Sequence, residues 1–477
     1  MRFSQYTVVS RRSEKTCLFN TRTSNIVLLP GLAYQSLSEK SLSGLTLPQR
    51  MDLIKQGMLV PSPQREAQEY YLRYMKERQK YPMWILTLTP TYACNLGCTH
   101  CVQYDFDKTE KMTYETVESV LEFMRYLLDN RGTAGIWVWF YGGEPFVCPG
   151  QCEKVIEGVK RICSEYGMRS YFAVTTNGTL LTAKASRGMV DGMDYFYTGM
   201  AQSRQAQGRE RPYLDGRNSY DAVMEGMALA AKLGKRIKVR FNVSEPEKIP
   251  RDMPVVLNDL LRAFGGELYQ TIRFTFKILR PRDIDVSSPK VQEEMSRKHH
   301  SLETIVRDAQ KNSPWPGKHF SKPGKHVFLK TAFPVTPGVG GCGFELCCEY
   351  VRGNRFALRP DGRLEMCHVR ENDPGLIFGH VSDPEQALSY GRYLRIMNFS
   401  PYLDPVCRKC AYLPMCLVKC PLGVIDQDEP TLRTGSCRQE CREAVDHYIN
   451  DVLTLRGADE SLLVPISASS DIVGDDC

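Results

Sequence analysis

The sequence predicts an α/β protein: a partial (β/α)6 TIM-like barrel between a small winged-helix-like domain and a cysteine-rich domain. Three observations indicate this fold class. Strand-like and helix-like patterns alternate between residues 84 and 280, which is typical of a parallel sheet covered by helices. Short strand-like runs followed by helical patterns fill residues 1–80. Cysteines gather between residues 342 and 441.

The first 80 residues are expected to form a small separate domain. Its three strand-like runs and its helical patterns lie at 6–9, 17–19, 26–29, 32–41, 47–58 and 63–80. The last pattern is highly charged and is predicted to be an exposed connecting helix. Strands followed by helices suggest a winged-helix-like unit. Such a unit can recognise a peptide by adding it as a strand to an exposed sheet edge.

Residues 81–280 carry the alternating pattern of the predicted barrel. Strands are expected at 84–89, 136–141, 171–176, 194–200, 236–243 and 272–279. Helices are expected at 113–130, 150–166, 182–190, 219–233 and 251–264. These units are too few for the complete eight-stranded barrel, so an incomplete barrel is predicted. Ligands of α/β folds bind at the carboxyl ends of the strands, so the loops there are candidate sites.

The composition excludes several classes of function. A chain of 477 residues with 42% hydrophobic and 25% charged residues is typical of a globular protein of more than one domain. A net charge of +7 without a clustered basic stripe argues against nucleic-acid binding. The chain has no apolar run of membrane-spanning length and no signal peptide at its start, so a cytoplasmic protein without a membrane partner is expected. In that compartment, clustered cysteines favour metal binding or catalysis over disulfides.

Three of the 18 cysteines follow the first predicted strand of the barrel directly: Cys94, Cys98 and Cys101. Three thiolates cannot complete the four-coordinate shell of a structural zinc site. A 4Fe–4S cluster can take three thiolates and leave its fourth iron open for a small molecule. The spacing therefore favours a catalytic iron–sulfur site.

Further polar motifs end the next strands. Gly142-Gly143-Glu144-Pro145 closes the second strand, where glycines allow close backbone approach and Glu144 offers a carboxylate to an ammonium group. Asn177 follows the third strand, and Arg240 and Asn242 lie near the end of the fifth. Each motif alone is also compatible with an ordinary turn. The cysteine loop, the Gly-Gly-Glu-Pro motif and the Asn177 segment end three successive strands, which indicates one ligand site.

Residues 84–280 resemble the radical S-adenosylmethionine (radical SAM) superfamily in the order and spacing of these motifs. The resemblance implies that Cys94, Cys98 and Cys101 hold a 4Fe–4S cluster whose open iron binds SAM. It implies that Gly142, Gly143 and Glu144 contact the amino group of SAM, and that His100 packs near its adenine. Asn177 is implied to contact the ribose region, and Arg240 the carboxylate. Reductive cleavage of SAM then gives a 5′-deoxyadenosyl radical that abstracts hydrogen from a substrate.

The region of the fourth strand departs from one branch of that superfamily. Relatives that mature sulfatases typically carry Ser-Leu-Asp-Gly there, whereas this chain has Tyr197-Thr198-Gly199-Met200-Ala201-Gln202. The acidic residue is absent, which lowers the expectation of sulfatase maturation.

The cysteine-rich region at 341–455 carries Gly362-x4-Cys367 and then a Cx2Cx5Cx3C run. Spacing alone also allows two zinc ribbons. The pattern is similar to the SPASM extension of radical SAM enzymes, which implies two auxiliary 4Fe–4S clusters and three clusters in all. The implied ligands are Cys342, Cys348, Cys367 and Cys420 for the first, and Cys407, Cys410, Cys416 and Cys437 for the second. Cys347 competes with Cys348, and Cys441 competes with Cys437.

Two further segments have no motif. Residues 281–340 form a basic connector, either a solvated loop or a docking surface for an acidic peptide. Residues 456–477 are expected to be a mobile tail.

The SPASM resemblance implies an enzyme that modifies a ribosomally made peptide, by a thioether or carbon–carbon crosslink or another side-chain oxidation. The auxiliary clusters would accept or relay the electron. The expected partners are a precursor peptide with leader and core, and an external electron donor such as flavodoxin or ferredoxin. Two alternatives stay open: protein oxidation of the sulfatase-maturase type, and a non-catalytic iron–sulfur scaffold. No catalytic acid or base is identified by the sequence.

Overall fold

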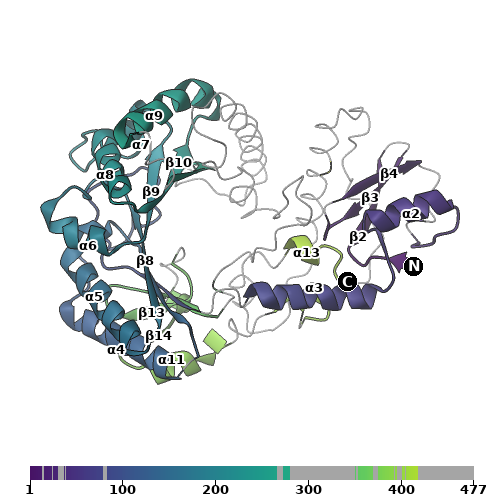
Figure 1. Cartoon of the computed structure of the whole chain (residues 1–477), viewed down its shortest axis with the longest axis horizontal. Helices are drawn as coiled ribbons and strands as arrows, with labels where there is room; N and C mark the ends of the chain where they lie inside the picture. The colour runs from purple at the N-terminus through teal and green to yellow at the C-terminus, as the bar shows by residue number, and fades with distance from the viewer. Residues whose placement is uncertain are drawn as a thin grey trace. The chain divides into compact units, whose positions relative to one another are not determined.

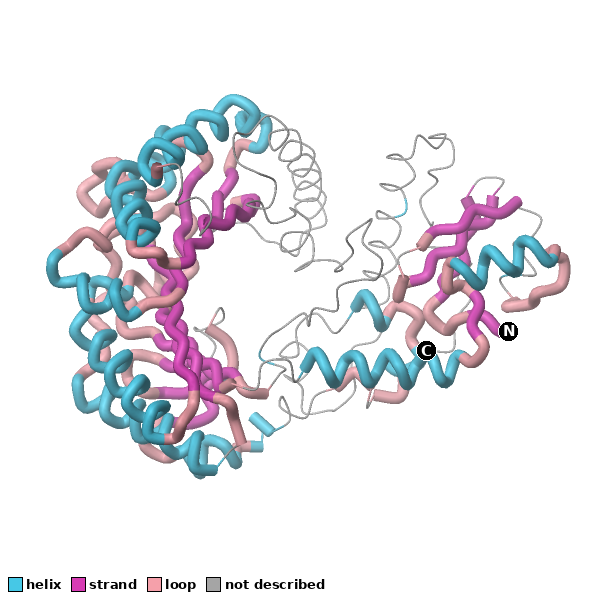
Figure 2. The backbone as a smooth tube through the Cα atoms, viewed as in Figure 1, coloured by secondary structure: helices cyan, strands magenta, loops and turns pink. Residues whose placement is uncertain are grey.

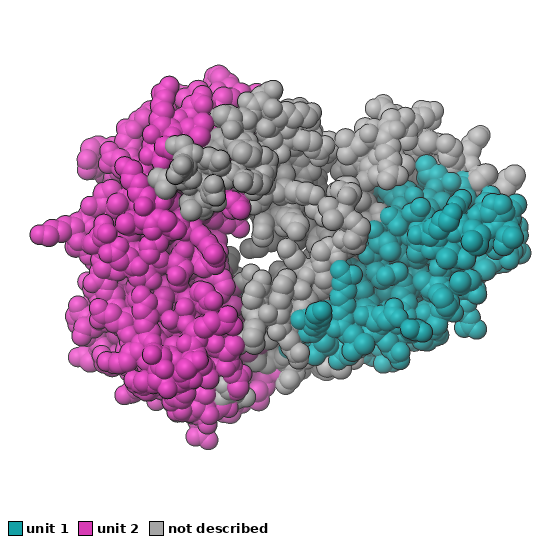
Figure 3. Space-filling model, viewed as in Figure 1, with its two compact units in different colours: residues 1–80, 328–351, 395–477 teal, residues 81–327, 352–394 magenta. Residues whose placement is uncertain are grey.

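The computed structural model of this chain describes residues 1–12, 15–23, 25–30, 37, 39–78, 83–130, 132–265, 272–279, 350, 353–368, 374–391, 393–394, 400–402, 404–416 and 449. It divides into two compact units, coloured separately in Figure 3. Unit 1 comprises residues 1–80, 328–351 and 395–477, and unit 2 comprises residues 81–327 and 352–394. The units therefore cut across the consecutive segments expected from the sequence. The expected connector at 281–340 and the tail at 456–477 lie outside the described residues.

Unit 1 contains the three strands predicted near the N-terminus. Strands β2 (Thr7–Arg12), β3 (Lys15–Asn20) and β4 (Ile26–Pro30) form an antiparallel sheet in that order. Two short strands missed by the sequence analysis, β1 (Arg2–Phe3) and β5 (Leu59–Val60), form a separate antiparallel pair. The predicted helix at 32–41 lies mostly outside the described residues.

Two helices complete the N-terminal part of unit 1 (Figure 1). Helix α2 (Leu47–Lys55) starts at Thr46, which forms a capping box with Gln49. Buried side chains of α2 and the sheet form one apolar core, which includes Val9, Leu18 and Leu53.

Helix α3 (Pro63–Arg78) differs from its prediction as an exposed connector. It buries Tyr70 and Tyr74, spaced by one helical turn, in a cluster with Tyr6 and Leu413. Leu413 belongs to the cysteine-rich region, so α3 packs against residues far away in sequence. The charged composition concealed this stripe, because only one face of the helix is buried.

Unit 2 is built on a curved sheet with helices outside it (Figures 1 and 2). The described strands have the order β11-β10-β9-β8-β7-β6-β12-β13-β14, and neighbours from β11 to β12 are parallel. The six predicted strands are β6 (Trp84–Leu88), β7 (Gly135–Phe140), β8 (Arg169–Thr176), β9 (Tyr195–Ala201), β10 (Arg236–Val243) and β11 (Ile272–Ile278). The partial TIM-like barrel is thus confirmed.

The helices predicted between these strands are present at α4 (Tyr114–Asn130), α5 (Pro149–Glu165), α6 (Arg187–Gly192), α8 (Tyr220–Lys232) and α9 (Ile249–Phe264). Their apolar stripes explain their position. In α4, for example, Val117, Val120 and Met124 share one buried face. A short helix that was not predicted, α7 (Arg204–Glu210), follows β9.

The sheet continues beyond the predicted barrel. Strand β12 (Arg355–Leu358) pairs in parallel with β6, and β13 (Arg363–Glu365) and β14 (Ile377–His380) extend the sheet in antiparallel fashion. These strands come from the cysteine-rich region, which the sequence analysis had treated as a separate domain. Part of that region therefore completes the sheet of the barrel.

Candidate active site

The loop that carries Cys94, Cys98 and Cys101 leaves the carboxyl end of β6 and is held by the Gly-Gly-Glu motif that follows β7. Gly143 N–H donates to the Thr91 carbonyl at 2.9 Å, and Glu144 N–H donates to the Ala93 carbonyl at 2.8 Å. A Cβ atom on Gly143 would lie 2.1 Å from the Ala93 oxygen, which is impossible. The glycines therefore allow the backbone after β7 to approach the cysteine loop closely.

A second segment holds the other side of the same loop. Gly97 N–H donates to the Pro212 carbonyl at 2.8 Å, and Thr99 N–H donates to the Glu210 carbonyl at 3.0 Å. Leu96 also forms an antiparallel bridge with Tyr213. The cysteine loop thus lies between two backbone partners, one after β7 and one after α7. Such pairing fixes the loop before any ligand binds.

The three cysteine side chains are half-buried and close enough to influence one another. Burial, together with the nearby Glu144 and Cys98, raises the pKa of Cys94 to about 11. Burial also raises the pKa of Cys98, while the Arg211 guanidinium lowers it and Cys101 raises it. Cys94 and Cys98 therefore keep their thiol protons at neutral pH until a metal displaces them.

This donor set fits a 4Fe–4S cluster better than a single ion. Across the described part of the chain, no three His, Cys, Asp or Glu side chains lie close enough together to hold one metal ion. A cluster binds each thiolate on a different iron, so its ligands stand further apart. The Cys94 sulfur also accepts weak hydrogen bonds from Leu96 N–H at 3.4 Å and from the Asn177 amide at 3.7 Å, as cluster thiolates do.

Glu144 is completely buried beneath this loop. Its carboxylate accepts hydrogen bonds from Phe146 N–H at 3.1 Å, from the Thr176 hydroxyl at 2.8 Å and from Asn177 N–H at 2.6 Å. Burial raises the pKa of Glu144 to about 7, against the effect of these donors and of Arg211. The carboxylate therefore links the ends of β7 and β8, and it retains room for one further donor.

The side chain of Asn177 also forms hydrogen bonds with other residues of the protein. Its amide donates to Asn95 Oδ1 at 2.8 Å, and its Oδ1 accepts from the Thr179 backbone at 2.9 Å and from the Thr179 hydroxyl at 2.7 Å. The structure therefore joins Asn177 to the cysteine loop.

His100 and Asn242 meet at the end of β10. Asn242 Nδ2 lies 3.4 Å from His100 Nε2, and Asn242 is buried. The expected adenine neighbour is thus held against β10. Arg240, two residues earlier, keeps exposed surface at one part of its side chain, but the surrounding protein removes most of the water near its guanidinium and so lowers its pKa. Tyr141 opposes this shift, and Arg211 adds to it. Because side chains alternate along β10, the Arg240 side chain lies on the inner face of the sheet, opposite the buried Val239 and Phe241.

Arg211 is the main site residue that the sequence analysis missed. It follows α7, is only 7% exposed, and its Nε has no hydrogen-bond partner among the described residues. It lies over Gly199, where a Cβ atom would be 3.0 Å from Nη1. Its charge acts on both Cys98 and Glu144. The sequence has several arginines in this stretch, and nothing in the pattern showed which of them turns inward.

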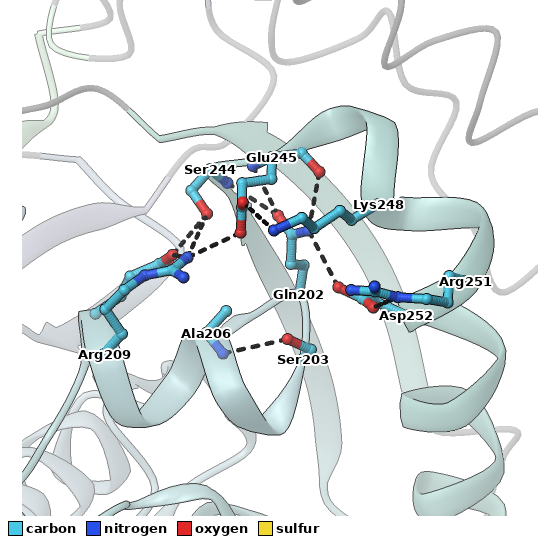
Figure 4. A network of polar contacts seen from close by, with 10 residues as sticks. Gln202, Ser203, Ala206, Arg209, Ser244, Glu245, Lys248, Arg251 and Asp252 are labelled. Carbon is cyan, nitrogen blue, oxygen red and sulfur yellow. Dashed lines mark hydrogen bonds and ion pairs between the residues drawn. The ribbon is translucent and has the colours of Figure 1, made fainter.

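A polar network at the ends of β9 and β10 supports this arrangement (Figure 4). Gln202 is fully buried; its amide donates to the Glu245 carbonyl at 2.9 Å, and its oxygen accepts from Ser244 and Glu245 N–H at 3.0 Å each. Arg209 forms ion pairs with Glu210 at 2.8 Å and with Glu245 at 3.0 Å. Gln202 stands in the stretch where sulfatase maturases typically have an acid, and here it joins two strand ends.

The cysteines of the expected auxiliary clusters are only partly described. Cys367 follows β13 in unit 2, and the next residue, His368, packs its ring edge-on against Tyr141 at 4.9 Å. In unit 1, Cys407 and Cys410 lie in a tight turn in which Asp404 accepts from Cys407 N–H at 2.7 Å. The other expected ligands, for which the structure gives no side-chain description, are Cys342, Cys348, Cys416, Cys420 and Cys437.

The described helices do not include one that combines the length and the apolar character needed to span a membrane.

Comparison with known proteins identifies the barrel. Residues 88–244 match the family model of the Radical SAM superfamily. The fold is similar to that of hexahistidine-tagged anSMEcpe with bound AdoMet, at a TM-score of 0.53 and 15% identity over 80% of this chain and 97% of that one. Native anSMEcpe with bound AdoMet and Cp18Cys peptide has a TM-score of 0.52 and 16% identity, over 79% of this chain and 99% of that one. Streptococcus suis SuiB has a TM-score of 0.48 and 14% identity, over 92% of this chain and 99% of that one.

No curated protein matches the chain in sequence. The family match begins at the end of β6 and spans the cysteine loop, the Gly-Gly-Glu motif and strands β7 to β10, which are the elements that build the site described above. Over residues 88–244 the chain thus matches the Radical SAM superfamily.

Proposed function

We propose that this chain is a SPASM-type radical SAM enzyme that modifies a ribosomally made peptide. When bound, the 4Fe–4S cluster and SAM together supply a 5′-deoxyadenosyl radical that abstracts hydrogen from the substrate. One observation carries the proposal: three cysteine side chains lie on a loop that Gly143, Glu144 and the segment after α7 hold by backbone hydrogen bonds. A scaffold for electron transfer alone would not need a buried carboxylate and a buried guanidinium beside these thiols.

The residues around the loop can divide the work of holding SAM. Arg211 is the best candidate for the SAM carboxylate, because its buried guanidinium lies beside Cys98 and has a donor to spare. This gives Arg240 the weaker claim. Glu144 and the backbone of Gly142 and Gly143 are proposed to face the amino group. His100 is proposed for the adenine and Asn177 for the ribose region.

Two auxiliary 4Fe–4S clusters are proposed in addition, with the cysteine ligands implied by the SPASM resemblance. Their role would be to accept or relay the electron that the substrate radical loses. The tight turn around Cys407 and Cys410 supports a ligand role, because it presents two thiols from one short segment.

The peptide substrate is proposed on two grounds. One similar structure, native anSMEcpe, contains a bound peptide named Cp18Cys. In unit 1, strand β4 lies at the edge of the described sheet, beside a cavity of about 540 Å³. Residues of β4 and α2 line that cavity, among them Ile26, Leu28 and Asp52. A leader peptide could pair with this edge as an added strand. Protein oxidation of the sulfatase-maturase type is disfavoured because Gln202 and its neighbours supply no acid.

Anaerobic reconstitution tests the proposal. Purified protein is loaded with iron and sulfide, reduced, and mixed with SAM, and 5′-deoxyadenosine is quantified. Coexpression with short peptides encoded beside the enzyme, followed by mass spectrometry and, for unchanged masses, by stereochemical analysis, then identifies the modification. Formation of 5′-deoxyadenosine with a modified peptide supports the proposal. Iron binding without any cleavage of SAM would leave only the scaffold alternative.

Arg211→Gln is expected to weaken SAM binding by about tenfold to about a hundredfold, the range for losing a charge-assisted hydrogen bond. Iron content should stay that of the wild type, because Arg211 is not a cluster ligand. Equilibrium binding of SAM to reconstituted protein measures the effect. The matched control is Arg217→Gln, an exposed arginine of the same loop that pairs with Asp215. Equal affinity in wild type and Arg211→Gln would remove Arg211 from the carboxylate site.

SAM affinity is expected to depend on pH through Glu144. The pKa of this carboxyl is raised to about 7, so below that pH a proton competes with the ammonium group of SAM. Affinity should therefore rise as the pH increases through about 7, and fall once the amino group of SAM loses its own proton near about 8. Glu144→Gln should lose the rising limb, and Glu157→Gln, at an exposed position of α5, should keep it. An unchanged rising limb in Glu144→Gln would assign it to another group.

A further inference from the structure

The segment that carries Cys407 and Cys410 is fastened to the N-terminal part of unit 1. Three carbonyls of this segment, spaced three residues apart, accept hydrogen bonds from N-terminal side chains: Arg408 from Gln5 at 3.2 Å, Ala411 from Thr21 at 2.5 Å and Pro414 from Tyr70 at 3.3 Å. Two of these donors follow from the sheet and one comes from α3. The turn that presents the two thiols is therefore held in place by elements far away in sequence.

The buried side of this turn lies against tyrosine rings. Cys410 packs on the apolar core that Tyr6, Tyr70, Tyr74 and Leu413 form. Tyr402, which precedes the turn in the chain, packs on the same core, with its ring centroid 5.1 Å from that of Tyr74 and 6.4 Å from that of Tyr70. An expected iron ligand and Tyr402 thus share one apolar wall, which keeps water away from this side of the turn.

The hydroxyl group of Tyr402 is a buried donor without an acceptor. Its oxygen has no hydrogen-bond partner among the residues that the structure describes. Burial, together with Tyr70, Tyr6 and Tyr74, raises the pKa of Tyr402 far above its ordinary value, so the hydroxyl keeps its proton at every working pH. Buried hydroxyls nearly always have a partner. This one therefore points to an acceptor that is not a protein group.

The other tyrosines of this core have less claim to such an acceptor. Tyr70 already donates to the Pro414 carbonyl. The hydroxyl of Tyr6 also lacks a partner within the described part of the chain, but the Gln5 side chain and the Arg22 guanidinium lower its pKa. Polar groups of the N-terminal part therefore stand near Tyr6, whereas only burial and other phenols act on Tyr402.

An iron–sulfur cluster at Cys407 and Cys410 supplies the kind of acceptor that this hydroxyl needs. Thiolate and sulfide sulfurs of such clusters accept hydrogen bonds, and those bonds help to set the reduction potential. The hydrogen of a donor carries partial positive charge, so it stabilises the cluster more after an electron has been added. A donor at this position therefore raises the potential. A buried water molecule is the competing acceptor.

We propose that the Tyr402 hydroxyl donates a hydrogen bond to a sulfur of the auxiliary cluster held by Cys407 and Cys410, and so raises its reduction potential. The inference rests on the proposed function, because that cluster is part of it. Tyr402 is a tuning residue rather than a catalytic one, since it acts on the substrate only through the cluster. A higher potential makes this cluster a better acceptor for the electron that the substrate radical loses.

A redox titration of the reconstituted full chain, followed by electron paramagnetic resonance, tests the inference. The signal that Cys407→Ala removes identifies the cluster. Tyr402→Phe deletes the hydroxyl and keeps the ring, so it should make reduction of that cluster about tenfold less favourable, a fall of about 59 mV for one electron. The titration detects only chains that hold the cluster, so a partial loss of iron does not obscure the shift.

The matched control is Tyr71→Phe. The ring of Tyr71 also packs on Tyr402, with centroids 5.2 Å apart, but Tyr71 is partly exposed on α3. This variant should keep the potential of the wild type. An unchanged potential in Tyr402→Phe would overturn the inference and assign the hydroxyl to a buried water. An equal shift in both variants would also overturn it, because packing alone would then explain the change.

Failure of the proposed function gives a different result. If Cys407→Ala removed neither a signal nor iron from the chain, there would be no cluster at this turn, and the inference would fall together with that part of the proposed function. If the signal were present and Tyr402→Phe left its potential unchanged, only the inference would fall. Formation of 5′-deoxyadenosine by the wild type, measured separately, reports on the cysteine loop of unit 2.

Discussion

Cys98→Ala is expected to abolish cleavage of SAM. Cys98 lies at the centre of the cysteine loop, where its charge interacts with Cys101, Glu144 and the Arg211 guanidinium. Alanine leaves two thiols, which cannot hold a cluster that keeps one open iron. We expect 5′-deoxyadenosine to fall to background and about four irons per chain to be lost, the content of one 4Fe–4S cluster. Iron analysis, absorbance and product quantification check both effects.

The matched control is Cys163→Ala. Cys163 is a buried cysteine of α5 that lies outside the loop. Its replacement should leave the iron content and 5′-deoxyadenosine formation close to those of the wild type. Wild-type activity in Cys98→Ala would contradict the assignment of the cluster to this loop. Loss of iron in both variants would instead point to a general defect in folding, which circular dichroism would detect.

Gly143→Ala should have the second large effect. The added Cβ would lie 2.1 Å from the Ala93 oxygen and 2.4 Å from the Tyr92 oxygen, and both are backbone atoms that cannot move aside alone. The loop must then separate from the end of β7, which breaks the hydrogen bonds of Gly143 and Glu144 with it. We expect a loss of more than about 3 kcal/mol in the free energy of unfolding, and loss of the cluster with it. Denaturant unfolding and iron analysis measure these effects.

Gly132→Ala provides the comparison for that variant. Gly132 precedes β7, and a Cβ atom there meets nothing within 4 Å. The same chemical change should therefore cost little, or should stabilise slightly by restricting the unfolded chain. If Gly143→Ala bound its full complement of iron and unfolded like the wild type, the contact between motif and loop would not be essential for the site.

The sequence predicted much of the barrel because its strands are strongly patterned. Each of the six strands from β6 to β11 lies within a few residues of its predicted bounds, since buried parallel strands separated by amphipathic helices leave a clear signal. The extension through β12, β13 and β14 was missed. These strands are short and come from a cysteine-rich stretch, where pairing with β6 is a long-range choice that no local pattern records.

The side chains of the site were likewise predicted from the sequence only in part. Glu144 was identified as a site residue from its motif, whereas its full burial and its bonds to Thr176 and Asn177 depend on how β7 and β8 are placed. Arg211 could not be found, because the sequence around it holds several arginines and only the fold turns this one over Gly199.

The sequence by itself determined the order of the strands along the chain, the three-cysteine loop after the first of them and the motifs at the next strand ends. Local spacing is enough for these features, because a loop that follows a strand must leave from its carboxyl end. Only the tertiary structure decided which groups meet there: the backbone of Gly143 against Ala93, and the Arg211 guanidinium beside Cys98. Contacts between distant segments depend on how the whole sheet packs, so they cannot be predicted from any one stretch of sequence.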